Sequence, residues 1–198
     1  MRKFQASKIP LPLAKLPPIC TNHLDVEIGC GVGLHSVTYA KANPNRVLVA
    51  IDKSSVRFEK MMDRIRSVGG MDNLIPIREN AVWFVTHEIS PSSVENYFFL
   101  YPNPYPKKRQ ANKRWYQMPF MEHVLETLKK KGRIHLATNI DDYASEAQAY
   151  LIHEWKMKLI EKQIYSSLHQ CPFEPRTHFE KKYLERGNVC WNQVFEKN

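Results

Sequence analysis

Short apolar runs alternate with longer amphipathic stretches along most of this chain. Runs of four or five apolar residues are typical of strands buried on both faces of a parallel sheet, and apolar residues recurring every three or four positions predict helices. The predicted strands are 24–28, 47–51, 74–77, 97–101 and 134–137. The predicted helices are 34–42, 56–68, a short turn at 81–85, 115–131 and 142–159. Glycines after residue 68 and at position 132 are expected to end the second and fourth of these helices.

The two ends of the chain break this alternation. Residues 1–22 are rich in proline and lack periodicity, so we expect an arm that lies across the domain or stays partly mobile. Near the C-terminus, segments 163–168 and 188–195 resemble strands, and the polar loop between them leaves no room for another full helix. They predict an antiparallel pair at one sheet edge. The expected organisation is an arm (1–22) and one α/β domain (23–198).

Composition favours a soluble protein that binds a polyanion. The chain has 198 residues, of which 43% are apolar and 11% aromatic, which suits one globular domain. Its formal charge of +9 implies an acidic partner, either nucleic acid or an anionic membrane surface. No apolar run approaches the roughly 20 residues that span a bilayer, and prolines interrupt the start too often for a signal sequence. We therefore predict a cytoplasmic protein without a membrane partner.

The cysteines predict no metal site. Cys20, Cys30, Cys171 and Cys190 are scattered, form no CxxC pair, and have no metal-ligand spacing with the eight histidines. We interpret them as reduced, mostly buried thiols.

A glycine-rich turn follows the first predicted strand. Glu27 precedes Gly29, Gly31 and Gly33, and a helix opens immediately afterwards, so the backbone can approach a ligand closely. Leu34 stands where a dinucleotide fingerprint needs a small residue, which disfavours a bound pyrophosphate. Asp52, at the end of the second strand, can accept hydrogen bonds from the hydroxyl groups of a ribose. This combination predicts S-adenosylmethionine as cofactor, with Glu27 near its positively charged end.

Asn80 has two interpretations. It lies just past the third predicted strand, where its side chain can recognise adenine. It is equally suited to forming a turn there.

Residues 96–114 combine a buried strand, a stiff loop and a cluster of cations. Pro102, Pro104 and Pro106 hold Asn103 and Tyr105 on an extended loop at the strand's carboxyl end, where ligands bind in open α/β sheets. Five cations follow: Lys107, Lys108, Arg109, Lys113 and Arg114. Because aromatic residues can stack on bases while cations meet phosphates, we predict RNA contact through these cations and Tyr105.

Four segments together resemble the bacterial tRNA (guanine-N7)-methyltransferase family. They are EIGCGVG, the YPNPYPKKRQANKR run, LATN at 136–139, and RTHFE at 176–180 followed by WNQVFEKN. The resemblance implies a Rossmann-like class I methyltransferase fold, with a mostly parallel seven-stranded sheet, an antiparallel C-terminal strand and helices on both faces. It implies methyl transfer from S-adenosylmethionine to N7 of a guanosine in tRNA, by a monomer or weak homodimer.

The resemblance also implies site residues. Asn103 takes the position of the family's catalytic loop residue, and Asn139 that of a second residue facing the guanine. Thr177 and Glu180 match a Thr-x-x-Glu element and would contact cofactor or guanine, although Thr177 is also suited to capping a loop. Phe179, Trp191 and Phe195 are predicted core residues.

The departures from the family pattern leave two further hypotheses open. Asn80, Asn103 and Asn139 stand where the family has aspartate. Asn103-Pro104-Tyr105-Pro106 also resembles the Asn-Pro-Pro-aromatic loop of enzymes that methylate exocyclic or amide nitrogens. Alternatively, the loss of three carboxylates fits a non-catalytic RNA-binding relative. A guanine-N7 acceptor needs no general base, so positioning dominates the expected chemistry.

Overall fold

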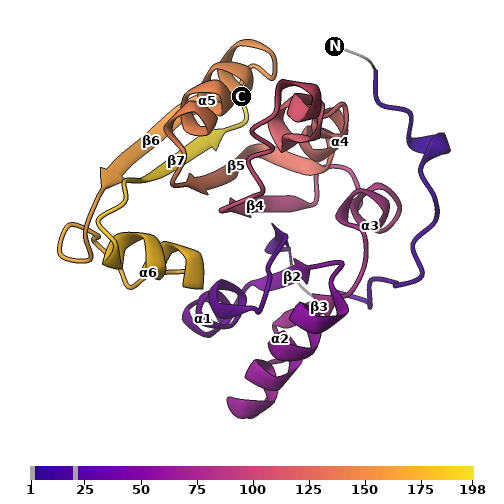
Figure 1. Ribbon diagram of the computed structural model, residues 1–198. Helices are drawn as coiled ribbons and strands as arrows, with labels where there is room; N and C mark the ends of the chain where they lie inside the picture. Colours follow the sequence, from indigo (N-terminus) through magenta and orange to yellow (C-terminus); the bar gives the residue numbers. More distant parts are fainter. Residues whose placement is uncertain (1–2, 20–21) are drawn as a thin grey trace.

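The computed structural model describes residues 3–19 and 22–198 and contains a seven-stranded sheet of order β3-β2-β1-β4-β5-β7-β6 (Figure 1). The strands are β1 (Leu24–Ile28), β2 (Val47–Ile51), β3 (Leu74–Ile77), β4 (Val94–Leu100), β5 (Leu128–Thr138), β6 (Lys158–Tyr165) and β7 (Cys190–Glu196). Strands β1 to β5 pair in parallel, whereas β7 runs antiparallel to both β5 and β6. The predicted mostly parallel sheet with an antiparallel C-terminal strand is confirmed.

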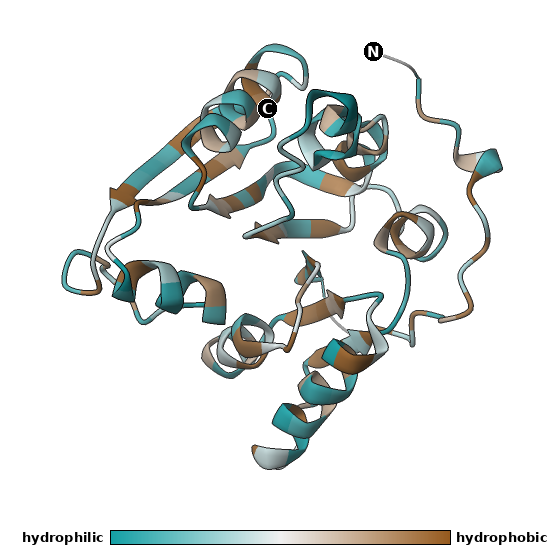
Figure 2. Cartoon of the chain, in the orientation of Figure 1, coloured by the Kyte–Doolittle hydropathy of each residue, from teal (hydrophilic) through white to brown (hydrophobic). Residues whose placement is uncertain are grey.

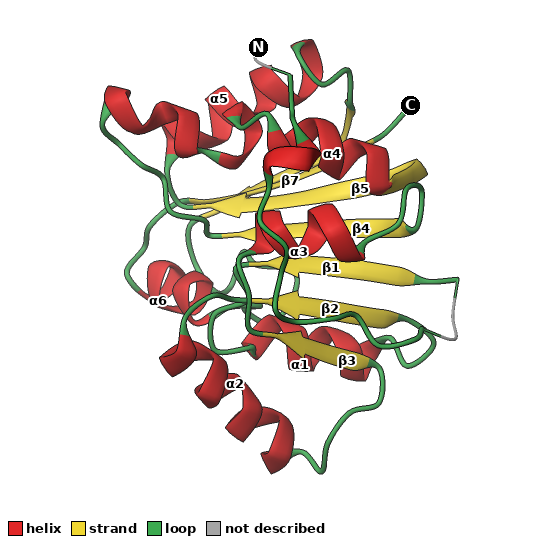
Figure 3. Cartoon of the chain, turned by 90° about the vertical axis from the view of Figure 1, so that its right-hand side faces the viewer, coloured by secondary structure: helices red, strands yellow, loops and turns green. Residues whose placement is uncertain are grey.

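Helices cover both faces of the sheet, as predicted (Figure 3). Helices α1 (Leu34–Ala42) and α2 (Ser55–Ser67) pack on one face, and α3 (Ala81–Glu88), α4 (Phe120–Thr127) and α5 (Asp141–His153) pack on the other. A sixth helix, α6 (His178–Glu185), lies beside the carboxyl ends of the parallel strands (Figure 3).

The core explains why the predictions of the first two strands succeeded, whereas the predicted bounds of β4 to β7 differ from the observed ones. Val26 and Val49 belong to the cluster beneath α3 to α5, whereas Leu48 and Ala50 belong to the cluster beneath α1 and α2, and all four are fully buried. A strand covered on both faces needs apolar residues at successive positions. Along α2, which has one face open to solvent, hydrophobic and hydrophilic residues alternate (Figure 2).

The predicted helix over 115–131 is wrong in its second half. A 3-10 turn, η3 (Trp115–Gln117), precedes α4, and the chain enters β5 directly at Leu128. Lys129 and Lys131 therefore lie in a strand, where their amino groups contact Glu95 and Glu196. Gly132 ends no helix: a Cβ there would lie 2.7 Å from Leu128 Cδ1, so the glycine permits close approach within the strand.

The predicted helix over 142–159 is too long, and the tail contains a helix that the prediction denied. Helix α5 ends at His153, and residues 158 and 159 already pair with β7 in β6. Helix α6 occupies the loop that was predicted to hold no full helix. Phe195 is buried as predicted, but Phe179 is 57% exposed, because it lies on the outer side of α6 against the Tyr183 ring.

The described part of the N-terminal arm crosses the side of the domain next to α3 (Figure 1). Phe4, Leu16 and Ile19 pack against the core, and Glu88 on α3 accepts from the Leu16 amide at 2.9 Å. Cys30 and Cys190 are buried thiols, whereas Cys171 is half-buried and Cys20 lies outside the described residues. Within residues 3–19 and 22–198, no helix is long and apolar enough to cross a membrane.

Candidate functional site

The carboxyl ends of the parallel strands bring most of the predicted site residues to one edge of the sheet. The glycine turn follows β1, Asp52 follows β2, Asn80 follows β3, and residues 101–106, here called the proline loop, follow β4. Asn139 follows β5 and is half-buried. Helix α6 lies at the same edge (Figure 3).

The glycine turn needs its glycines for two different reasons. Gly29, Gly31 and Gly33 all have φ between +60° and +78°, which side chains other than glycine adopt with strain. A Cβ at Gly31 would meet no atom within 4 Å, so this side of the turn is open to a ligand. A Cβ at Gly33 would lie 2.4 Å from Met61 Cγ, so Gly33 allows α2 to pack tightly on the turn.

Asp52 is a buried carboxylate that shapes the glycine turn. One oxygen accepts from the Gly31 amide at 3.0 Å, and the other accepts from the Ser54 amide at 2.8 Å. The guanidinium of Arg57, which is half exposed, donates to the same carboxylate at 3.1 to 3.3 Å. Asp52 thus carries negative charge directly beside the turn.

Glu27 is also buried, but beneath the turn. Its Oε2 accepts from Ser36 Oγ at 2.6 Å and lies 3.1 Å from His35 Nδ1, both at the start of α1. These contacts fix the carboxylate against α1.

Asn80 is the N-cap of α3. Its side chain accepts from the Val82 amide at 3.0 Å, which is the turn-forming role that its position equally suggested. The neighbouring Glu79 carboxylate accepts from the Asn80 amide and from Leu13 in the N-terminal arm.

The proline loop has an unusual backbone. Tyr101 and Tyr105 have φ of +51° and +44°, and Asn103 Oδ1 accepts from the Tyr105 amide at 3.2 Å. This side-chain turn holds Asn103 on the exposed tip of the loop, with Tyr105 half-buried behind it.

The five cations of the basic run are not equivalent. Lys107, Lys108, Arg109 and Lys113 are exposed, and Lys113 Nζ lies 5.9 Å from the centre of the Tyr105 ring. Arg114 is only 16% exposed, and its guanidinium contacts the proline loop and Glu146. The exposed four can reach a polyanion without rearrangement.

Glu180 is at the centre of a buried polar cluster that joins α6 to the end of β4. Its carboxylate accepts from the Arg176 guanidinium at 2.7 Å, from the Arg176 amide at 2.6 Å and from Tyr101 Oη at 3.0 Å. Burial alone would raise the pKa of Glu180, but the bonds from Arg176 hold it below its ordinary value. Burial and the neighbouring Glu180 charge raise the pKa of Tyr101.

Thr177 caps α6. Its Oγ1 accepts from the Glu180 amide at 3.0 Å, as in a capping box, although the Glu180 side chain bonds Arg176 N instead of Thr177 N. Arg176 was not singled out from the sequence. The only signal for it is its position directly before the capping threonine.

A second unpredicted residue, Arg64 on α2, connects the glycine turn to α6. Its Nε donates to the Val32 carbonyl at 3.1 Å, and one of its terminal nitrogens lies 3.0 Å from His178 Nε2. Arg64 therefore connects the glycine turn to the first residue of α6, a contact that sequence spacing does not reveal.

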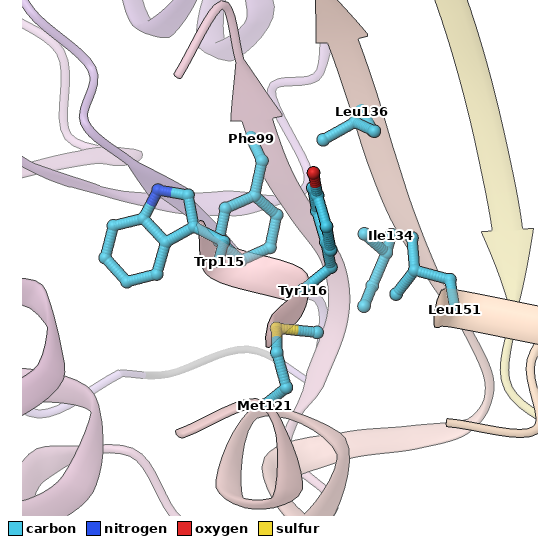
Figure 4. Close-up of a pocket in the computed structure, with 7 residues that line it drawn as sticks. All are labelled: Phe99, Trp115, Tyr116, Met121, Ile134, Leu136 and Leu151. Atoms are coloured by element: carbon cyan, nitrogen blue, oxygen red, sulfur yellow. The ribbon is translucent and has the colours of Figure 1, made fainter. Parts of the chain in front are cut away.

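A small cavity lies in the core, between the sheet and the helices of the α3–α5 face (Figure 4). Its volume is about 10 Å³, roughly the space for one water molecule. Apolar and aromatic side chains from β4, β5, η3, α4 and α5 surround it: Phe99, Trp115, Tyr116, Met121, Ile134, Leu136 and Leu151. It is a packing void and not a substrate pocket.

The strand order, the reversed seventh strand and the glycine turn at the carboxyl edge define a protein with a Rossmann-like methyltransferase fold. Solved structures share this fold. The match to an antibiotic-related methyltransferase covers 90% of this chain and 88% of that protein, with a TM-score of 0.61 and 15% sequence identity. The match to the 16S rRNA methyltransferase KamB covers 90% of this chain and 89% of that protein, with a TM-score of 0.62 and 20% sequence identity. The family model described as "Putative methyltransferase" matches residues 21–193, and the chain belongs to that family.

Curated relatives are more specific in their names. The tRNA (guanine-N(7)-)-methyltransferase of Nitrosomonas eutropha is 28% identical over 175 residues, which are 87% of this chain and 75% of that protein. The protein of the same name from Neisseria gonorrhoeae is 27% identical over 172 residues, which are 87% of this chain and 71% of that protein.

Proposed function

We propose that this chain transfers a methyl group from S-adenosylmethionine to N7 of a guanosine in tRNA. The observation that carries the proposal is the meeting, at one edge of the sheet, of the glycine turn with Asp52 and of the proline loop with its exposed cations. The relatives named above support the choice of guanine N7 and tRNA.

The residues present fit the cofactor. The open side of Gly31 admits a ligand close to the backbone, and the Asp52 carboxylate beside it can accept from ribose hydroxyls. Gly29, Gly31, Gly33 and Asp52 would hold S-adenosylmethionine, and Glu27, near the end of β1, would lie near its positively charged end. When bound, S-adenosylmethionine supplies an electrophilic methyl group on a sulfonium. Asn80 would act mainly by placing α3 beside this pocket.

Alignment of the guanine is the task of this chain's own residues. N7 attacks with its lone pair, so the new N–C bond takes electrons from the base, the S–C electron pair remains on sulfur, and no proton is transferred. Asn103 uses its Oδ1 to accept from the Tyr105 amide, which leaves its amino group free to donate to guanine O6. Asn139, directly after β5, would face the base, and Tyr105 would stack on it.

Four exposed cations would hold the tRNA. Lys107, Lys108, Arg109 and Lys113 lie directly after the proline loop, where phosphates flanking the target nucleotide can reach them. Thr177 and Glu180 would act through α6, whose cluster holds the base of the proline loop at Tyr101. A tRNA substrate favours a cytoplasmic enzyme, expected as a monomer or weak homodimer.

The test is methyl transfer with a mapped product. Tritium from labelled S-adenosylmethionine should enter one or more members of a full set of native tRNAs, and mass spectrometry should identify 7-methylguanosine. Absence of transfer to every native tRNA would refute the proposal. A product methylated at an exocyclic nitrogen would instead support the Asn-Pro-Pro-aromatic hypothesis. Asp52→Asn should weaken cofactor binding, whereas Lys108→Ala should weaken tRNA binding only.

A further inference from the structure

Arg114 is the one member of the basic run, within the described residues, whose guanidinium is directed into the protein. Its Nε donates to the Pro104 carbonyl at 3.1 Å, and one terminal nitrogen donates to the Tyr105 carbonyl at 3.0 Å. The other terminal nitrogen forms a short ion pair with Glu146 on α5. All three guanidinium nitrogens of Arg114 thus donate hydrogen bonds within the protein.

Glu146 is anchored as firmly as its partner. Besides Arg114, its carboxylate accepts from Tyr116 Oη at 2.7 Å and from Gln117 Nε2 at 2.5 Å. Glu146 projects from α5, which packs on β5 and η3. The carboxylate therefore connects the loop-binding arginine to a rigid helix.

The proline loop depends on donors from outside itself. Pro102, Pro104 and Pro106 have no N–H, and Tyr105 is held at a φ of +44°, which is a strained conformation for a residue with a side chain. The two bonds from Arg114 to successive carbonyls fix the backbone at this strained residue. A planar guanidinium suits this task because its donors form a rigid fork.

We propose that Arg114 and Glu146 form a clamp that positions the proline loop for methyl transfer, so that Arg114 is a positioning residue and not a phosphate contact. This inference rests on the proposed function, because the loop is the part of the site assigned to the guanine. The clamp sets the positions of Asn103 and Tyr105 relative to the glycine turn. Positioning of this kind acts on kcat, since a displacement of about 1 Å can cost roughly 100-fold.

The experiment compares Arg114→Ala, Arg114→Lys and Glu146→Ala with Arg109→Ala, an exposed cation of the same run. For each variant, kcat and KM for tRNA, the salt dependence of tRNA binding, and hydrogen exchange of residues 101–106 are measured. The clamp predicts that Arg114→Ala lowers kcat about 100-fold while the salt slope stays unchanged. Arg109→Ala should instead reduce the slope by about 1.

Two further results separate a clamp from a simple charge. Arg114→Lys keeps the positive charge but not the fork, so it should lose most of the same activity. Glu146→Ala should reproduce the loss of kcat, and both Arg114→Ala and Glu146→Ala should accelerate hydrogen exchange of the backbone amides in residues 101–106. The kcat of the double variant should be no lower than that of the poorer single variant. If Glu146→Ala does not fold in a thermal scan, Glu146→Gln takes its place, because the amide keeps the size of the side chain and one acceptor oxygen but removes the charge that pairs with Arg114.

The proposal is overturned if Arg114→Ala flattens the salt slope as Arg109→Ala does and Arg114→Lys restores kcat. It is also overturned if exchange of residues 101–106 is the same in the wild type and in the Arg114 and Glu146 variants. Failure of the proposed function gives a different result. The wild type would then transfer no methyl group to tRNA, while exchange in the proline loop would still accelerate in the clamp variants only.

Discussion

Gly33→Ala is the substitution whose energetic cost the structure defines most fully. At a φ of +73°, a side chain at position 33 carries about 1–2 kcal/mol of backbone strain. The new Cβ would also lie 2.4 Å from Met61 Cγ and 3.1 Å from its Cβ and Sδ, and such overpacking costs about 1–3 kcal/mol. We therefore expect Gly33→Ala to lower the free energy of unfolding by about 3 kcal/mol.

Gly31→Ala is the matched control, because it adds the same methyl group at a φ of +60° with no atom within 4 Å. It should cost only the strain, about 1–2 kcal/mol. Urea unfolding at constant m-value measures both, and calorimetry measures S-adenosylmethionine affinity. Although Gly31→Ala is the milder change in stability, its methyl group projects into the open side of the turn, so it should be the more damaging to cofactor binding.

Met61→Ala tests the cause of the difference. With the Met61 side chain truncated, the 2.4 Å contact with Cγ is lost and only the 3.1 Å contact with Cβ remains, so Gly33→Ala should cost little more than Gly31→Ala does in the wild type. Two results would contradict the packing argument: equal costs for the two glycine variants in the wild-type background, or an undiminished cost of Gly33→Ala when it is combined with Met61→Ala.

Three other predictions concern polar groups that lie in or against the core. Desolvation of the imidazole, and secondly the neighbouring positive charges, lower the pKa of His135 from 6.5 to about 3. The neutral ring therefore contributes its full stabilisation above pH 6.5, and this contribution declines as the pH falls toward 3. The free energy of unfolding should fall by about 2 kcal/mol between pH 8 and pH 5, and His135→Gln should abolish that loss. Glu180→Gln leaves Arg176 without its buried counter-charge and should lower stability by about 3 kcal/mol in urea, with an unchanged midpoint contradicting the ion pair. Asp25→Asn removes a fully buried carboxylate held by Arg46 at 2.6 Å and should also cost about 3 kcal/mol by thermal unfolding, whereas loss of the exposed Arg66–Asp63 pair should cost less than about 1 kcal/mol.

The parallel half of the sheet could be predicted from sequence because its strands are buried on both faces. The bounds predicted for β1, β2 and β3 agree with the structure at every residue. For β2 and β3 the local pattern and the tertiary environment impose the same requirement, namely apolar side chains at successive positions. In β1 every second residue is apolar, and the buried Asp25 and Glu27 between them are hydrogen-bonded.

The segment from 115 to 131 could not be predicted in this way. Phe120, Val124 and Leu128 have helical spacing, yet only the first two are in α4. Leu128 instead pairs with Val94 across β4 and β5, and the lysines that suggest a helix C-terminus find carboxylates on neighbouring strands. Long-range pairing overrides local propensity here, and nothing within the segment indicates it.

Helix α6, in contrast, did carry a local signal. Thr177 and Glu180 have the spacing of a capping box, which predicts a helix start irrespective of family. The expectation of a loop arose because both residues were interpreted only as ligand contacts. The contacts of Arg64 and Arg114 and the bond from Tyr101 to Glu180 are different, since each joins segments whose proximity depends on the complete fold.

Asn80, Asn103 and Asn139 are predicted to stand where the family has aspartate, and at two of these positions asparagine keeps the structural part of the role. Asn80 caps α3, and asparagine and aspartate cap helices about equally well. Asn103 closes the side-chain turn to Tyr105, which either residue can form. What changes is the charge: three carboxylates are absent from the edge that also carries the exposed lysines and Arg109. Because attack by N7 needs no base, this edge can favour RNA phosphates more strongly while the residues that align the base stay in place. Under the proposed function, we expect these replacements to bear first on tRNA affinity and its salt dependence, and only secondarily on the chemical step.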